Sequence, residues 1–172
     1  MGNIITPDQL IEKFGMDATR YLLISEFPFG NDGDISLERF QKRYNAELAN
    51  GLGNLTQRVL TLCINSKFQI PNVKKIPKSK FSNIQNKLIN LDFTGYVGEI
   101  NKIIQECNQQ IDKNKPWKLK AGSQELNQFL LGILEQIKLI GELLQPIMPE
   151  IAEKIEKQLK TLKPEPLFQR KL

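Results

Sequence analysis

The feature that most constrains the fold is a long run of apolar residues at helical spacing in the first half of the chain. Steps of four and three residues keep side chains on one face of an α-helix. The pattern predicts the longest helix of the chain at 36–66, with Ser36 as its cap. A helix with one apolar face needs other helices to cover it. The apolar residues of this face are Tyr44, Leu48, Leu52, Leu55, Val59 and Leu62.

Further helices are predicted by similar spacing and by residues that favour helix ends. Thr6, Pro7 and Gln9 form a helix start with a capping box, and Gly15 suits the end of that short helix. Pro116 forces a break. No alternating strand pattern or internal repeat occurs, so the predicted fold class is all-α. The other helices are expected at 17–26, 80–91, 94–113, 124–144 and 149–159, with a turn-rich segment at 27–34, an exposed connector at 68–80 and an irregular tail.

Two glycines lie inside the predicted long helix. Each costs about 1 kcal/mol of helix propensity relative to alanine. Such glycines usually mark close packing or the close approach of a partner, but at any single site a tolerated glycine is commoner. We therefore expect Gly51 and Gly53 to be tolerated.

Charge is distributed unevenly along the chain. Residues 1–35 carry six acidic and two basic side chains, a net charge of −4, and the +5 of the whole chain leaves +9 on residues 36–172. A basic body behind an acidic start is typical of domains that bind a polyanion. A lysine-rich surface without such a role explains the charge equally well.

Several kinds of site are disfavoured by what the sequence lacks. Without histidine, the commonest general base is missing, and Cys63 and Cys107 cannot form a Cys/His zinc site. Carboxylates and lysines could still catalyse, so an enzyme site is disfavoured and the question stays open. We expect the cysteines to be reduced, half-buried thiols of a cytoplasmic protein. The acidic segment 29–34 lacks the later glutamate of a calcium loop and is interpreted as a turn. No membrane span or secretory signal is visible.

A stripe of polar residues accompanies the apolar face of the long helix. Glu47, Asn50, Asn54 and Arg58 are spaced three, four and four residues apart, so they share one helix face. At 100° per residue that face is centred about 120° from the apolar face and points outward. Asparagine and arginine can read base edges as well as phosphate. An outward polar stripe is nonetheless usually just solvated, so alone it indicates binding only weakly.

The single tryptophan of the chain has an unusual setting. Trp117 directly follows Pro116, and the lysines near it in sequence are Lys113, Lys115, Lys118 and Lys120. An aromatic side chain among cations is typical of proteins that stack on an unpaired base. Tryptophan in general is more often partly buried core, by about three to one, so the pattern alone favours a core role. Asn108, nine residues earlier, could reach the same region.

Two early segments resemble class I aminoacyl-tRNA synthetases. Gly2–Ile5 is similar to the Gly-Asn-Val-Ile run that follows the KMSKS loop of those enzymes. Asp17–Leu22 is similar to their Asp-Ala-Leu-Arg-Tyr motif. Several members of the class share both, so these segments indicate the class and not the amino acid.

Four later segments resemble methionyl-tRNA synthetase in particular. The resemblance spans nearly the whole chain and is weakest at 68–90. It implies an anticodon-binding helical bundle at 36–172, preceded by most of a small stem-contact-fold segment at 1–35. The four segments are Pro28–Ser36, Arg43–Asn54, Asn108–Trp117 and Pro146–Ala152.

The resemblance also implies a function and a set of site residues. In that family, the equivalents of Asn54, Arg58 and Trp117 bind the CAU anticodon of methionine tRNA. The tryptophan stacks on the wobble cytosine, and the asparagine and arginine hydrogen-bond the splayed bases. We expect Asn50 and Asn108 to belong to the same site. The implied partners are methionine tRNA, through its anticodon loop and inner stem, and the catalytic domain of the same enzyme, with no membrane.

The parts of such an enzyme that carry out the chemistry are missing. The HIGH motif needs a histidine, no KMSKS lysines precede Gly2, and the zinc-binding insertion is absent. The full-length enzyme would attach methionine to tRNA with ATP, and zinc is its second candidate cofactor. We expect no catalytic residue, cofactor or metal in this chain and no activity from it alone. It is expected to be a C-terminal part of the enzyme, with Met1 native or added and further sequence after Leu172 left open.

Two alternatives stay open. The chain could be a non-catalytic helical scaffold or protein-interaction bundle, whose basic faces meet an acidic partner. It could instead be the anticodon-binding domain of another class I synthetase. The combination of Asn54, Arg58 and Trp117 speaks against the second alternative.

Overall fold

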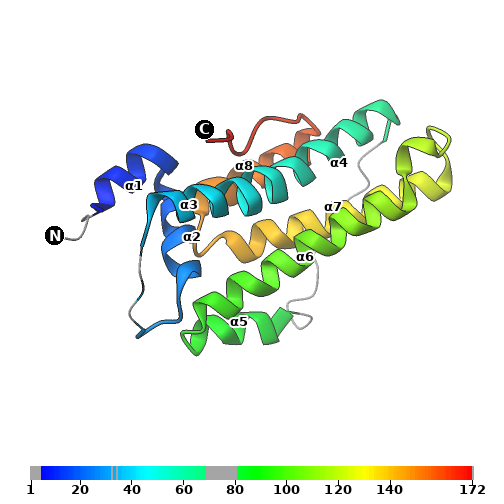
Figure 1. Ribbon diagram of the computed structural model, residues 1–172. Helices are drawn as coiled ribbons and strands as arrows, with labels where there is room; N and C mark the ends of the chain where they lie inside the picture. Colours follow the sequence, from blue (N-terminus) through cyan, green and yellow to red (C-terminus); the bar gives the residue numbers. More distant parts are fainter. Residues whose placement is uncertain (1–4, 32, 34, 69–80, 172) are drawn as a thin grey trace.

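The computed structural model describes residues 5–31, 33, 35–68 and 81–171. This part of the chain folds into helices without a strand, so the predicted all-α class is confirmed (Figure 1). None of its helices is long and apolar enough to cross a membrane. The elements are α1 (Pro7–Phe14), α2 (Met16–Glu26), α3 (Leu37–Arg43), η1 (Tyr44–Gly53), α4 (Asn54–Asn65), α5 (Ser82–Ile89), α6 (Phe93–Asn114), η3 (Pro116–Lys118), α7 (Gln124–Leu144) and α8 (Pro149–Thr161).

Some predictions fall outside the described residues. The connector at 68–80 does so apart from Phe68, and so do Gly2–Ile4 of the class I motif and Asp32 and Asp34 of the predicted turn. The earlier part of that turn is described: Asn31 N–H donates to the carbonyl oxygen of Pro28 at 3.1 Å.

Most helix boundaries follow from residues that cap helix ends. At the start of α1, the N–H of Gln9 donates to the Thr6 hydroxyl, and the N–H of Thr6 donates to the Gln9 side chain. Gly15, with a φ of +84°, joins α1 to α2 in a conformation that glycine adopts readily. The hydroxyls of Ser36 and Ser123 likewise accept from the N–H three residues later, at the starts of α3 and α7. Local sequence therefore predicts where these helices begin.

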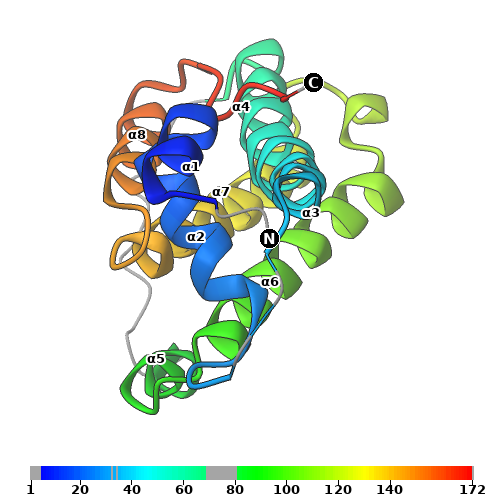
Figure 2. The same ribbon diagram turned by 60° about the vertical axis from the view of Figure 1, so that its left-hand side comes forward.

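Four helices form the body of the molecule. α7 contacts both α4 and α6, and α8 packs along α7. Figure 1 shows α4 and α6 running in the same direction, with α7 running back and α8 returning beside it. α1 and α2 lie at one end of this body, where α2 contacts α6 and α8 (Figure 2). The ends of α4 and α6 lie at the other.

The central helix α7 supplies much of the core. Its buried positions recur at helical spacing, at Leu130, Ile133, Ile137, Ile140 and Leu144 among others. Burying one such side chain stabilises the fold by about 1.5–3 kcal/mol. Tyr96 of α6 is buried beside them, and its hydroxyl donates to the Leu143 carbonyl oxygen at 2.6 Å. Burial raises the pKa of Tyr96 to about 12, so it stays a donor.

The predicted helix at 36–66 forms, but not as a single α-helix. It is divided into α3, the π-helical η1 and α4, which follow one another without a break. In a π-helix an N–H bonds the carbonyl five residues earlier, as Asn54 does with Ala49. Because the turns are wider, side chains that are four residues apart in sequence stay on the core side. In an α-helix, each step of four residues would rotate the side chain by about 40° around the helix axis. Those side chains are Phe40, Tyr44, Leu48 and Leu52, each at most 3% exposed.

The two glycines of η1 make room for these turns. A Cβ atom on Gly51 would lie 3.2 Å from the carbonyl oxygen of Ala46, and one on Gly53 would lie 3.1 Å from that of Leu48. In both cases the oxygen belongs to the residue five positions earlier. Phe168 from the C-terminal tail also packs over Gly53. The expectation that both are merely tolerated is therefore wrong.

The C-terminal tail is irregular, as predicted, but it is anchored to η1. The rings of Phe168 and Tyr44 meet edge to face, with centroids 6.0 Å apart. The side chain of Asn45 accepts from the N–H of Lys171 at 2.9 Å and donates to its carbonyl oxygen at 2.7 Å. Leu167 is buried. The tail thus covers the π-helical segment from outside.

Residues 1–35 join the rest of the chain through buried polar contacts. Asp17 accepts from the N–H of Ile151 at 2.9 Å, which ties the start of α2 to the first turn of α8. The side chain of Glu26 is 2% exposed and pairs with Arg39 and Arg43. The apolar core is also continuous across this junction. A domain boundary between 1–35 and 36–172 stays a prediction.

Glu47 belongs to a third such contact and not to an outward stripe. The Tyr21 hydroxyl donates to Glu47 at 2.8 Å, and the Asn101 amide donates to the Tyr21 oxygen at 2.8 Å. Burial, and then the nearby charge of Glu47, raise the pKa of Tyr21 well above its ordinary value. The prediction that groups Glu47 with Asn50 and Asn54 is wrong, because it assumed α-helical turns throughout.

The two cysteines are free thiols, as predicted, but they are fully buried and not half-buried. Cys63 is 0% and Cys107 1% exposed. Burial raises the pKa of Cys63 to about 12 and that of Cys107 to about 11. A raised pKa keeps the thiol protonated, so at pH 8 only about one Cys107 in a thousand is a thiolate.

Both thiols are therefore expected to resist Ellman's reagent at pH 8 in the folded protein. In guanidinium chloride the same reagent should label both at once, which serves as the control. Fast labelling of the folded protein would contradict the buried arrangement.

Candidate nucleic-acid interface

The predicted site residues of α4 meet α6 in an ion pair at the surface. The Nη2 atom of Arg58 lies 2.9 Å from Oδ1 of Asp112. Their side chains are 32% and 66% exposed, so the pair is open to solvent. Asn54 lies one turn before Arg58, and Asn108 one turn before Asp112. Because α4 and α6 run in the same direction (Figure 1), both asparagines lie on the same side of the pair.

Trp117 is held at the surface beyond the end of α6. It is 53% exposed, so the expectation from tryptophan's general preference for the core is wrong here. Lys115 ends α6 with a φ of +45°, and buried Pro116 begins the short helix η3. The N–H of Lys118 donates to the Lys115 carbonyl oxygen at 2.8 Å and closes this turn. A buried proline and a closed turn thus fix the backbone that carries the exposed indole.

The lysines near Trp117 in sequence are exposed too, as expected of a surface for a polyanion. Four ammonium groups lie within four residues of the indole along the chain, and this part of the surface is accordingly basic. They are Lys113, Lys115, Lys118 and Lys120.

The three predicted asparagines differ in their settings. Asn54, the first residue of α4, is exposed. Asn50 is exposed in η1, one turn farther from the Arg58–Asp112 pair. Asn108 is partly buried, and its amide donates to the Ile104 carbonyl oxygen of its own helix at 3.0 Å. The structure therefore places Asn54 and Asn108 each about one turn from the Arg58–Asp112 pair, and Asn50 about two turns from it.

Sequence reasoning missed Asp112 as a member of this site. Its carboxylate binds the guanidinium that is expected to contact bases, so it decides how available Arg58 is. A signal was present: Asn108 and Asp112 are four residues apart, as are Asn54 and Arg58. Two such pairs can match across neighbouring helices. Which helices are neighbours, however, is a tertiary fact that spacing does not contain.

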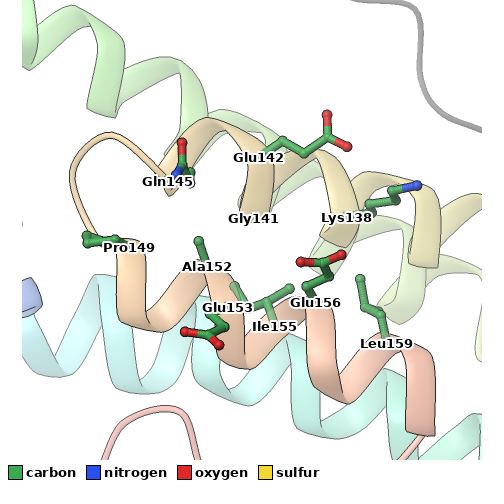
Figure 3. Close-up of a pocket in the computed structure, with 10 residues that line it drawn as sticks. All are labelled: Lys138, Gly141, Glu142, Gln145, Pro149, Ala152, Glu153, Ile155, Glu156 and Leu159. Carbon is green, nitrogen blue, oxygen red and sulfur yellow. The ribbon is translucent and has the colours of Figure 1, made fainter.

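A hollow of about 410 Å³ lies elsewhere, between α7 and α8 (Figure 3). Gly141 of α7 and Ala152 of α8 are among the residues that line it, and carboxylates outnumber ammonium groups around it. That charge disfavours a polyanion. Within the described residues, no three Cys, Asp or Glu side chains gather as a metal site would require. The charged residues of the hollow are Lys138, Glu142, Glu153 and Glu156.

Comparison with known proteins points to one family. A family model described as "tRNA synthetases class I (M)" matches residues 1–60. The methionine–tRNA ligase of Synechocystis is 36% identical over 173 residues, covering 92% of this chain and 32% of that protein. The methionine–tRNA ligase of Rickettsia felis is 35% identical, covering 98% of this chain and 36% of its own length. These relatives are enzymes, and the chain spans about a third of their length.

Comparison of the fold with solved structures points to the same family. The crystal structure of free methionyl-tRNA synthetase from Mycobacterium tuberculosis superposes with a TM-score of 0.83 at 25% identity. The match covers 98% of this chain and 41% of that one. A second structure of the enzyme, with methionyl-adenylate, gives 0.77 at 27% identity. By sequence and by fold, the chain belongs to the methionyl-tRNA synthetase family of class I.

Proposed function

We propose that this chain is the anticodon-binding part of a methionyl-tRNA synthetase and that it recognises the CAU anticodon of methionine tRNA. The observation that carries the proposal is the exposed Trp117 at the end of the bundle that also holds Arg58 and Asn54. The family membership supports methionine tRNA over other tRNAs. The basic surface around the indole supports an RNA ligand over an apolar or cationic one.

Each residue has a chemical role in this proposal. Trp117 stacks on the unpaired wobble cytosine, a contact of about 1–3 kcal/mol per base. Arg58 and Asn54 donate to base edges, and Asn108 and Asn50 extend the same polar surface. The nearby lysines neutralise phosphates. Each phosphate contact should lower the slope of log K against log salt by about 0.7 for single-stranded RNA.

In this proposal, the attachment of methionine to tRNA takes place outside this chain. In the complete enzyme, methionine is attached to the tRNA with ATP, and the two thirds of the relatives' length not covered here carry that activity. ATP, and zinc where an enzyme contains it, bind there. The catalytic domain is thus a partner of this chain within one polypeptide. The isolated chain binds tRNA without charging it.

Replacing Asp112 by asparagine is expected to strengthen RNA binding and to increase the preference for the CAU loop, because Arg58 is then free to contact the bases. The change frees Arg58 from its ion pair and removes a negative charge near the phosphates. Exposed ion pairs contribute about 0–1 kcal/mol, so affinity should rise by up to about fivefold. Fluorescence titration with CAU and non-CAU stem-loops measures both effects.

The matched control is Glu106→Gln, an equal change of charge at an exposed position of the same helix. It should raise binding of all loops slightly and leave their ratio unchanged. Equal effects of the two variants would show that Asp112 acts on RNA binding only through its negative charge and not through its pairing with Arg58. Weaker binding by Asp112→Asn would contradict its role as a competitor for Arg58.

A competition experiment separates the proposal from its two rivals. Stem-loops with the anticodons of several class I tRNAs compete for the chain at fixed salt, and the preferred loop should carry CAU. Equal binding of every loop, lost steeply as salt rises, would indicate a basic scaffold. Preference for another anticodon would indicate a different synthetase.

A further inference from the structure

A second hollow, of about 570 Å³, lies where the end of α4 meets the start of α7. Lys67 and Phe68, just after α4, line one side of it, and the first two turns of α7 line the other. It lies at the end of the bundle that also carries Trp117, because α4 and α6 end there and the chain passes through η3 into α7 (Figure 1). We name it the α4–α7 hollow. Its residues on the α7 side are Gly122, Gln124, Asn127, Gln128 and Leu131.

The backbone on both sides of the hollow is held by hydrogen bonds. Lys67 has a φ of +54°, and its N–H donates to the carbonyl oxygen of Ile64 at 3.0 Å. The N–H of Phe68 donates to the carbonyl oxygen of Cys63 at 2.9 Å, which closes the end of α4. On the other side, the hydroxyl of Ser123 caps the first turn of α7. The hollow is therefore formed by two fixed helix ends.

The side chains that line the hollow suit a nucleobase. Gln124, Asn127 and Gln128 are three and four residues apart, so their amides share one face of α7. An amide carries both donors and acceptors, and such groups read the edges of unpaired bases. Phe68 and Leu131 add apolar surface for the flat face of a base. Among the described residues, no carboxylate lines the hollow, so a metal ion is disfavoured.

Asn127 carries an acceptor without a partner. Its Oδ1 atom is buried and has no hydrogen-bond partner within the described part of the chain. A buried polar atom without a partner costs about 1–3 kcal/mol. Because Asn127 lines the hollow and the terminal torsion of its side chain is soft, a donor in the hollow can reach this oxygen. The exocyclic amino groups of adenine, cytosine and guanine are such donors.

Charge and position favour RNA as the source of this base. Among the described residues that line the hollow, Lys67 is the only charged one, and the start of a long helix such as α7 carries a partial positive charge. Trp117 precedes Gly122 by five residues, so their Cα atoms are at most about 18 Å apart. One RNA strand is long enough to place a base at each position.

We propose that the α4–α7 hollow binds a second unpaired base of the anticodon loop, one that lies outside the CAU triplet and carries an exocyclic amino group. The inference rests on the proposed function for the identity of the RNA. It goes beyond that function, because the chain then reads a part of the loop besides the anticodon. The triplet itself is assigned to Trp117, Arg58 and Asn54, which lie on the α4–α6 side of the bundle.

Stem-loops that lack single bases test the proposal. Every loop keeps the CAU triplet, and the unpaired bases on either side of it are removed one position at a time. Fluorescence anisotropy gives the affinity of each loop for the unmodified chain at one salt concentration. Removing the base that fills the hollow should weaken binding by about fivefold or more, the effect of one well-paired base. Uracil at that position should lose most of the same binding, because it has no exocyclic amino group.

Two variants assign the effect to the hollow. In Asn127→Ala and in Gln128→Ala, the loss caused by removing that base should shrink to about twofold or less, because the two changes remove the same contact. Gln128 is exposed, so its loss should leave the fold intact. The matched control is Gln85→Ala, which removes an exposed amide of α5 at the opposite end of the bundle and should keep the full effect (Figure 1). Circular dichroism checks the fold of each variant.

Two results would overturn the inference. The first is binding that does not respond to any base beside the triplet, and the second is an effect as large in both hollow variants as in Gln85→Ala. Failure of the proposed function gives a different result. If changing the wobble cytosine has no effect while the flanking base still acts through Asn127 and Gln128, anticodon recognition is refuted and the role of the hollow stands.

Discussion

Replacing Trp117 by alanine is expected to weaken binding of a CAU stem-loop by about 1–3 kcal/mol, or about five- to 150-fold. The physical reason is the loss of the flat surface on which the wobble base stacks. The fold should be unaffected, because the indole is 53% exposed. Fluorescence anisotropy with a labelled stem-loop measures the affinity, and circular dichroism confirms the fold.

Phe29→Ala is the matched control for this variant. Phe29 is also an exposed aromatic residue, at 66%, but it lies away from the proposed anticodon site. Its loss should leave RNA affinity unchanged. A folded Trp117→Ala protein that still prefers the cognate loop as strongly as the wild type would show that the site is assigned wrongly.

Replacing Tyr44 by alanine is expected to lower the free energy of unfolding by about 3–5 kcal/mol. Tyr44 is 3% exposed and touches three parts of the fold at once. Its ring lies 5.4 Å from that of Phe14 in α1 and 6.0 Å from that of Phe168 in the tail, and it begins η1. Urea unfolding followed by circular dichroism gives the change in stability.

Gln57→Ala controls for the general effect of shortening a side chain on this run of helices. Gln57 is exposed on α4, so its loss should change stability by less than about 0.5 kcal/mol. If Tyr44→Ala costs no more than Gln57→Ala, the packing of α1, η1 and the tail around this ring is wrong.

Much of the helical pattern could be predicted because its causes are local. Thr6 and Gln9 form their capping box within four residues, and α7 begins at Gln124 as predicted, with Ser123 as its cap. Pro116 and Pro149 mark a break and a start for reasons of backbone chemistry. None of these needs knowledge of the rest of the chain.

The π-helical segment could not be predicted in this way. Its wider turns are stabilised by contacts from distant parts of the sequence: Tyr21 and Asn101 bond Glu47, and Phe168 packs over Gly53. A projection at a constant 100° per residue therefore placed Glu47 on the wrong face. Four apolar residues at three consecutive steps of four, from Phe40 to Leu52, with glycines near the end, are the trace that such a segment leaves in the sequence.

In the candidate site, too, some features could be predicted from local sequence and others depend on the tertiary fold. Asn54 and Arg58 could be grouped from their spacing on one helix. The pairing of Arg58 with Asp112 joins residues 54 positions apart and depends on α4 lying beside α6. The exposure of Trp117 depends on how the chain turns after Lys115, whereas general preferences of tryptophan favoured the core. Resemblance to a family supplied the role that spacing could not.

The most direct test of the central claim is a paired titration of the unmodified chain. A stem-loop carrying CAU and one differing only at the wobble cytosine are titrated at the same salt concentration. The proposed stacking on that base, flanked by Arg58 and Asn54, predicts clearly tighter binding of the CAU loop, by about 1 kcal/mol or more. Equal affinity for the two loops would contradict anticodon recognition by this chain.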